Sequence, residues 1–133
     1  MTKKNNTILV ADINVDSMEK LKADLIDDGF RVFTVESGRN VLTCMRRRVV
    51  DIAIIDVDLK DMEGYKIIPL MKDINRDVKV VITTKSNSTE LESICRAAGI
   101  IYYAIKPIDN SQLIKVVLSA IVNNKRFEEF EVN

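Results

Sequence analysis

Asp-Ile-Ala-Ile-Ile-Asp-Val-Asp, residues 51–58, is the stretch that decides the fold. The apolar run inside it is too short for a helix and suits a strand that is covered on both faces. The stretch ends in two acids, Asp56 and Asp58. Residues 7–12, Thr-Ile-Leu-Val-Ala-Asp, repeat this pattern and end in Asp12. Two buried strands of this kind favour a parallel sheet between layers of helices.

Strand-like and helix-like segments alternate along the chain. Residues 30–35 alternate at period two, as a strand near the edge of a sheet does, and Pro69 should bend or shorten the helix around it. Such alternation implies right-handed crossovers and a doubly wound α/β fold. We expect strands at about 7–12, 30–35, 51–58, 78–84 and 100–105, and helices at about 16–28, 37–48, 63–74, 87–98 and 109–122. The expected helix caps are Asp16, Ser37, Asn87 and Asp109.

The chain has 133 residues, with 20 Lys and Arg against 20 Asp and Glu, and no His. This length suits one compact domain, which we place at residues 1–124, followed at 125–133 by a polar tail or the start of a linker. A neutral chain argues against a protein that coats nucleic acid. The lack of His excludes His-based zinc sites, Ser-His-Asp triads and a phosphohistidine within this chain.

The cysteines and the hydropathy of the chain indicate the cellular compartment in which we expect the protein. Cys44 and Cys95 lie far apart without CxxC spacing, as expected of small buried residues in a reducing compartment. No apolar run approaches a membrane span, and the first six residues are polar. We therefore expect a cytoplasmic protein without a signal peptide or membrane segment.

Four of the predicted strands are followed by chemically active side chains: Asp12, Asp56, Thr84 and Lys106. In doubly wound sheets, functional residues gather beyond the carboxyl ends of the strands. Two carboxylates there favour a cation, above all oxygen-liganded Mg²⁺. A hydroxyl and a lysine can hold phosphoryl oxygens, and Asp can act as a phosphoryl nucleophile. A single strand-end Asp is more often a cap or turn residue, but the four together favour phosphoryl transfer.

Six segments within residues 7–122 carry a resemblance to a known family. They are Ile-Leu-Val-Ala-Asp (8–12), Asp-Ile-Ala-Ile-Ile-Asp (51–56), Met-Glu-Gly (62–64), Val-Val-Ile-Thr-Thr (80–84), Ala-Ala-Gly (97–99) and Lys-Pro (106–107). In sequence and spacing they resemble the receiver domains of two-component response regulators, the CheY-like family. The resemblance implies a five-stranded parallel sheet of order 2-1-3-4-5 in a flavodoxin-like three-layer sandwich.

The resemblance also implies roles for individual residues. Asp56 is the expected phosphoacceptor, Thr84 the hydroxyl that contacts the phosphoryl group, and Lys106 its cationic partner. Asp12 is the expected first member of an acidic pair that binds Mg²⁺, and Tyr103 the aromatic that changes rotamer on activation. The peptide bond between Lys106 and the following proline is expected to be cis.

The acidic pair departs from the family pattern. The family has two consecutive acids after the first strand, whereas this chain has Asp12-Ile13. An Ile side chain offers no oxygen, so we expect weak Mg²⁺ binding by Asp12, Asp56 and the backbone carbonyl of Asp58. The Asp58 side chain either compensates in part for the missing acid or faces solvent.

Two lysines also depart from the pattern. Lys85 follows Thr84 where a small residue is usual. It crowds the access of a phosphodonor, holds the phosphoryl group in place of the metal, or points into solvent. Lys60 stands where Pro is common after the acceptor strand, and this change should alter loop stiffness more than chemistry.

The leading hypothesis is a signalling switch rather than an enzyme, one that at most assists its own phosphorylation and dephosphorylation. A histidine kinase or phosphotransfer protein donates to Asp56, Thr84 moves inward and Tyr103 follows. The surface formed by residues 87–122 then changes its affinity for an output partner or for an effector domain missing from this sequence. The same surface suits a weak homodimer, and no direct binding of nucleic acid or membrane is expected.

Two alternatives stay open. A pseudo-receiver keeps the fold and binds partners without phosphorylation, and Ile13 and Lys85 favour it. A small flavin-binding protein of similar sheet order needs a phosphate-cradling loop after the first strand. Residues 13–16, Ile-Asn-Val-Asp, contain neither Gly nor a Ser/Thr cluster, so the flavin hypothesis is poorly supported.

Overall fold

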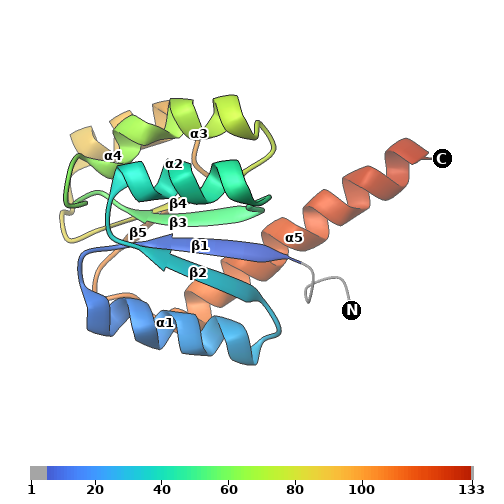
Figure 1. The fold of residues 1–133 in the computed structure, drawn as a ribbon, viewed down its shortest axis with the longest axis horizontal. Coiled ribbons are helices and arrows are strands. Elements are labelled where there is room, and N and C mark those ends of the chain that lie inside the picture. The colour runs from blue at the N-terminus through green and yellow to red at the C-terminus, as the bar shows by residue number, and fades with distance from the viewer. Residues whose placement is uncertain (1–5, 133) are drawn as a thin grey trace.

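The structure is a computed structural model that describes residues 6–132. One sheet of five parallel strands lies between two layers of helices (Figure 1). The strands are β1 (Thr7–Ala11), β2 (Arg31–Val35), β3 (Ile52–Asp56), β4 (Lys79–Thr84) and β5 (Tyr102–Ile105). Their order, β2-β1-β3-β4-β5, confirms the expected flavodoxin-like α/β fold.

The helices divide between the two faces of the sheet (Figure 1). One face is covered by α1 (Val15–Asp27) and α5 (Asn110–Val132). The other is covered by α2 (Gly38–Arg47), α3 (Ile68–Ile74), which follows the 3₁₀ turn η2 (Gly64–Ile67), and α4 (Thr89–Ala97). In the part of the chain that the structure describes, no helix is long and apolar enough to cross a membrane.

The sheet separates two hydrophobic cores. In β3, Ile52 and Ile54 pack in the core beneath α1 and α5, whereas Ala53 and Ile55 pack in the core beneath α2 and α3. Each is at most 2% exposed, and burying an Ile side chain contributes about 1.5–3 kcal/mol. Because successive side chains of a strand point to opposite faces, Asp56 lies on the α1–α5 side at the end of a firmly held strand.

Two helix caps lie one or two residues before or after the predicted ones. Asn14, not Asp16, caps α1, and its side chain accepts the amide three residues on at 3.1 Å. Ser88, not Asn87, caps α4 in the same way, also at 3.1 Å. In both helices the cap is the residue with extended backbone just before the first turn, which is the position that lets a side chain reach the free amides.

Two helix boundaries also differ from the prediction. Pro69 occupies the first turn of α3, where its missing N–H costs nothing, so the helix predicted from residue 63 begins as η2 and becomes α-helical at Ile68. At the other end of the chain, α5 continues to Val132, past the predicted end near residue 122. Figure 1 shows this helix projecting beyond the edge of the sheet. The division into a domain and a linker stays a prediction.

Candidate functional site

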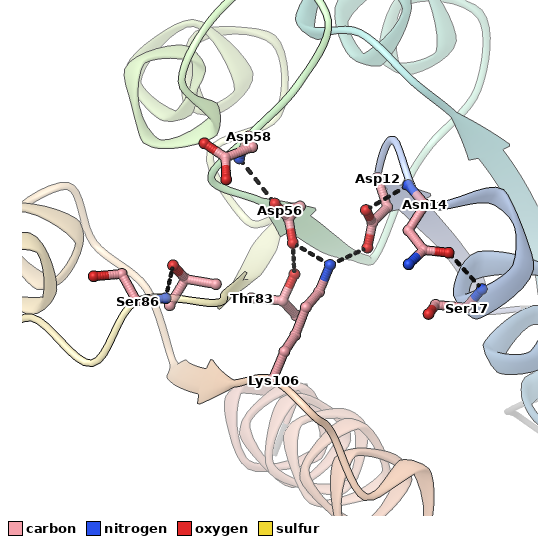
Figure 2. Close-up of polar contacts among 9 residues, drawn as sticks. Asp12, Asn14, Ser17, Asp56, Asp58, Thr83, Ser86 and Lys106 are labelled. Carbon is pink, nitrogen blue, oxygen red and sulfur yellow. Dashed lines mark hydrogen bonds and ion pairs between the residues drawn. The ribbon is translucent and has the colours of Figure 1, made fainter.

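The carboxyl ends of three strands bring two acids and a lysine together. Asp12 follows β1, Asp56 ends β3, and Lys106 follows β5 and is joined to its proline by a cis peptide bond, as expected. Lys106 Nζ lies 2.8 Å from Asp12 Oδ2 and 2.6 Å from Asp56 Oδ2 (Figure 2). The side chains of Lys106, Asp12 and Asp56 are 15%, 10% and 4% exposed. One largely buried ammonium group therefore bridges two largely buried carboxylates.

The two carboxylates keep Lys106 charged. Burial alone lowers the pKa of Lys106, but the hydrogen bonds and charges of Asp12 and Asp56 together outweigh burial and raise the pKa above its usual range. Charges buried this closely stabilise one another only as a set, because removing one partner leaves an uncompensated buried charge. Two carboxylates against one ammonium group leave the cluster with a formal negative charge.

Each oxygen of the Asp56 carboxylate accepts hydrogen bonds from the protein (Figure 2). Oδ1 accepts the backbone N–H of Asp58 at 2.8 Å. Oδ2 accepts the hydroxyl of Thr83 at 2.9 Å in addition to the ammonium group of Lys106. These donors hold the carboxylate in one orientation, with Oδ2 toward Lys106 and Oδ1 toward the loop after β3.

Thr83 belongs to this site although it was not predicted from the sequence. In the parallel pairing of β3 with β4, Asp56 lies opposite Thr83 and not opposite Thr84. Paired residues of neighbouring strands present their side chains on the same face. The strand periodicity of the sequence indicates that only one of the two threonines can share the face of Asp56, and the register of β3 against β4 selects Thr83.

Thr84, the predicted partner of the phosphoryl group, lies on the opposite face of the sheet. Its Oγ1 accepts the backbone N–H of Ser86 at 3.0 Å, and the described hydrogen bonds include none between Thr84 and Asp56. The hydroxyl of Tyr103 donates to the Ser86 carbonyl at 3.4 Å. Burial raises the pKa of the Tyr103 phenol, which keeps this donor protonated. Thr84 and Tyr103 therefore meet at the loop between β4 and α4, while the acids meet Lys106.

The acids do not complete a Mg²⁺ site in this conformation. Asp12 Oδ1 accepts the backbone N–H of Asn14 at 2.9 Å, so all four carboxylate oxygens of Asp12 and Asp56 already bond to protein donors. Ile13 is 48% exposed and has no oxygen to offer. The described residues hold no cluster of three or more His, Cys, Asp or Glu that could bind a metal. A divalent cation at this site would compete with Lys106 for the two carboxylates.

The two side chains expected to add charge, Asp58 and Lys85, are exposed. The backbone of Asp58 bonds to Asp56, but its carboxylate takes part in none of the described hydrogen bonds and ion pairs. Lys85 lines a cavity of about 780 Å³ together with Asp12, Lys106 and residues of α1 and of the segment that leads into α5. Lys85 thus lines the same cavity as Asp12 and Lys106 but takes part in none of the described ion pairs.

The loop after β3 is fastened to the start of α2. Asp61 Oδ1 accepts the backbone N–H of Gly38 at 2.7 Å, and Oδ2 accepts that of Arg39 at 3.0 Å. These two hydrogen bonds hold the pKa of the Asp61 carboxyl below its usual range. Asp58, which lies in this loop, therefore presents its backbone N–H to the site from a fixed position.

Lys60 ties the same loop to the residue before the cap of α2. Its backbone N–H donates to the carbonyl of Glu36 at 3.1 Å, and its ammonium group lies 3.3 Å from the Glu36 carboxylate. The ion pair is exposed, and such pairs contribute little to stability. The backbone hydrogen bond is therefore the part that restrains the loop.

Comparison with known proteins places the chain in one family. A family model described as the response regulator receiver domain matches residues 8–118. The chain therefore belongs to the response regulator receiver family, signalling domains of two-component systems that interact with histidine kinases and output domains.

Individual relatives agree with this assignment. The transcriptional regulatory protein ZraR of Escherichia coli O157:H7 is 32% identical over 123 residues, which are 92% of this chain and 28% of ZraR. The chain thus spans little more than a quarter of that relative's length. A CheY-like receiver domain from Methanospirillum hungatei JF-1 has a TM-score of 0.86 at 21% identity, covering 91% of this chain and 97% of that one. The receiver domain of a putative Luxo repressor from Vibrio parahaemolyticus has a TM-score of 0.87 at 22% identity, covering 95% and 97%. These two structures confirm the fold.

Proposed function

We propose that this chain is a phosphoryl-accepting switch in which Asp56 takes a phosphoryl group from a partner histidine kinase or phosphotransfer protein. The observation that carries the proposal is the bridge that Lys106 forms between Asp12 and Asp56 at the strand ends of a receiver-family chain. Carboxylates of Asp are known phosphoryl nucleophiles. This chain contains no His, so the donor phosphohistidine lies outside it.

The transfer itself needs positioning and charge stabilisation. An oxygen of Asp56 bonds to phosphorus as the P–N bond of the donor phosphohistidine breaks, and the electron pair of that bond stays on the donor imidazole. Asp56 loses its negative charge in this step, and Lys106 becomes free to pair with a phosphoryl oxygen. A cation already aimed at the reacting carboxylate stabilises the transferred charge without reorganisation.

The response starts at the loop between β4 and α4. Movement of Thr84 toward the phosphoryl group would break its hydrogen bond with the Ser86 N–H and release the loop that also accepts the hydroxyl of Tyr103. A phosphoryl group thus favours one of two arrangements of this loop, and a difference of a few kcal/mol suffices to shift the population.

The surface of α4, β5 and α5 is the proposed output face. It lies next to the loop just described, and it takes an output partner, an effector domain or a second copy of this chain in a weak homodimer. Exposed apolar side chains that support binding of a protein are Ile94, Ile101 and Ile105. The neutral charge of the chain supports an output without direct contact with nucleic acid.

Mg²⁺ binding is proposed to be weak. Receiver domains typically bind this ion, and here Asp12, Asp56 and the backbone carbonyl of Asp58 are the candidate ligands. Ile13 contributes no oxygen, and Lys106 competes for the same two carboxylates.

A pseudo-receiver is the second candidate function, because each carboxylate oxygen of Asp12 and Asp56 already accepts a protein donor and Ile13 stands where the family has an acid. Such a module would bind its partner without phosphorylation. The Asp56→Asn variant separates the two functions: a pseudo-receiver keeps its partner binding, whereas a phosphoryl switch loses the phosphorylation-dependent part of it.

The direct test is the intact mass after treatment with acetyl phosphate at increasing Mg²⁺ concentration. We expect the wild type to gain one phosphoryl group and Asp56→Asn to gain none. Asp51→Asn is the matched control, because Asp51 lies at the other end of β3, where its carboxylate accepts the Thr7 N–H at 2.7 Å. An unchanged wild-type mass, beside a typical receiver that is phosphorylated in the same buffer, rejects the proposal.

A further inference from the structure

The hydroxyl of Thr83 is aimed at the proposed phosphoacceptor. Thr83 is 3% exposed, lies directly opposite Asp56 in the strand pairing, and its Oγ1 is 2.9 Å from Asp56 Oδ2. Because an ionised carboxylate can only accept hydrogen bonds, the Thr83 hydroxyl is the donor. Thr83 therefore touches the group that would react.

The donors are divided unequally between the two oxygens of Asp56. Oδ2 accepts the Thr83 hydroxyl and the Lys106 ammonium group, whereas Oδ1 accepts one backbone N–H, from Asp58. Oδ1 is thus the oxygen with room to bond to phosphorus. Lys106 reaches the site on a long side chain that can follow the phosphoryl group, but Thr83 is short, buried and part of β4. The bond from Thr83 to Oδ2 therefore persists when Asp56 is phosphorylated.

We infer that Thr83 sets the lifetime of the phosphoryl group on Asp56 by stabilising the carboxylate that hydrolysis releases. The inference rests on the proposed function. In the hydrolytic step, a water oxygen bonds to phosphorus while the bond from phosphorus to Asp56 Oδ1 breaks. The electron pair of that bond returns to the carboxylate, and both protons of the water stay with the inorganic phosphate.

The direction of the effect follows from the change in charge on Oδ2. In the acyl phosphate, Oδ2 is a neutral carbonyl oxygen, and during hydrolysis it gains part of the returning negative charge. A hydrogen bond to a charged acceptor is about twice as strong as one to a neutral acceptor. The Thr83 hydroxyl thus stabilises the transition state more than the acyl phosphate, and interactions that are stronger in the transition state accelerate the step. Thr83 therefore shortens the lifetime of the phosphorylated state.

The experiment compares two substitutions of similar shape. Thr83→Val keeps the shape of the side chain and removes the donor, whereas Thr83→Ser keeps the donor. Each protein is phosphorylated with acetyl phosphate, the reagent is removed, and the loss of the phosphoryl group is followed by intact mass. We expect Thr83→Val to lose it about tenfold more slowly than the wild type, and Thr83→Ser to lose it at close to the wild-type rate. Equal rates in all three proteins, or faster loss from Thr83→Val, overturn the inference.

Further variants separate this effect from a loss of structure. Thr7→Val removes the hydroxyl of another buried threonine, at the opposite end of the sheet, and we expect it to leave the decay rate unchanged. If Thr83→Val does not fold, Thr83→Cys, a weak donor, is compared with Thr83→Ser. A longer lifetime in Thr83→Cys supports the inference and an equal one overturns it.

Failure of the proposed function gives a different result. If neither the wild type nor Thr83→Val gains a phosphoryl group, the phosphoryl switch is rejected, and the role of Thr83 with it. If the wild type is phosphorylated and the variants decay at its rate, only the role of Thr83 is rejected.

Discussion

Lys106 Nζ lies 2.8 Å from Asp12 Oδ2, so the acid after β1 is paired with a cation of the same chain. The same ammonium group reaches Asp56, and the three side chains form one partly charge-balanced unit. Two consequences of this unit can be measured without any phosphodonor: its contribution to stability and its competition with a metal ion.

Replacing the shared cation should destabilise the fold. Lys106→Met leaves two largely buried carboxylates without their partner, and we expect the free energy of unfolding at pH 7 to fall by about 3 kcal/mol. Urea unfolding followed by circular dichroism measures this change. Lys60→Met is the control, because its ion pair is exposed and should be worth less than about 1 kcal/mol. Similar effects of the two substitutions would contradict the prediction.

The pH dependence of the same stability difference has a definite sign. The folded state raises the pKa of Lys106, so the stability from its pairing is fully present below the unfolded value of about 10.4. It is lost as the pH rises through the higher folded value. The difference between the wild type and Lys106→Met should therefore stay level from about pH 7 to 10 and shrink above that. A difference that shrinks between about pH 7 and 9 would show that another group is responsible.

Restoring the second acid should strengthen metal binding. Ile13→Asp places a carboxylate beside Asp12 at an exposed position, and we expect the Kd for Mg²⁺ to fall by about tenfold or more, measured by titration calorimetry. Ile26→Asp adds the same charge at a similarly exposed residue of α1 and should leave the Kd unchanged. Equal affinities in Ile13→Asp and the wild type would mean that Lys106, not the missing acid, limits binding.

The end of β3 should tolerate no side chain at Gly64. A Cβ there would overlap the backbone carbonyl of Asp56 and lie 2.7 Å from the side chain of Ile55. Because backbone cannot yield, we expect Gly64→Ala to cost about 1–3 kcal/mol in urea unfolding. At Gly38 the added carbon meets the flexible end of Met62, so Gly38→Ala should cost clearly less. Equal costs at the two glycines would contradict this account.

Removing the two hydrogen bonds by which Asp61 holds the loop after β3 to α2 should lower the free energy of unfolding by an amount that depends on pH. Asp61→Ala loses a carboxylate that accepts two backbone amides at a helix start, worth about 1 kcal/mol at pH 7. The fold lowers the pKa of Asp61, so this stability is present above about pH 3.9 and is lost as the pH falls through the lower folded value. Asp58→Ala, which removes an exposed carboxylate from the same loop, should change stability little. The acid unfolding of the wild type and Asp61→Ala should converge at the lowest pH.

Much of the site was predictable because its charged side chains directly follow, or end, apolar runs that the sequence identifies as strands. The parallel sheet brings Asp12, Asp56 and Lys106 together at the carboxyl ends of its strands, and the apolar runs before them identify those strands. Thr83 could not be chosen over Thr84 from residue type alone, since both are threonines at the end of β4. Only the register of β3 against β4 decides which of them faces Asp56.

Helix boundaries were less predictable because neighbouring residues compete for the same cap. Ser37 caps α2 as expected, with its hydroxyl accepting the Asn40 N–H at 3.1 Å. Before α1, both Asn14 and Asp16 can accept amides, and the backbone geometry selects Asn14. The β4–α4 loop poses the same choice, and there Ser88 is selected. Such choices depend on how the preceding loop leaves the sheet, which composition does not encode.

The adjacency of Thr83 and Thr84 at the end of β4 has a mechanical consequence. Their α-carbons are joined by one rigid peptide unit of about 3.8 Å, yet one hydroxyl contacts the carboxylate beneath the sheet and the other contacts the loop above it. In the proposed switch, a displacement at Asp56 would therefore move both threonines together, because the peptide unit between them is rigid. The covalent backbone would then carry the change from one face of the sheet to the other.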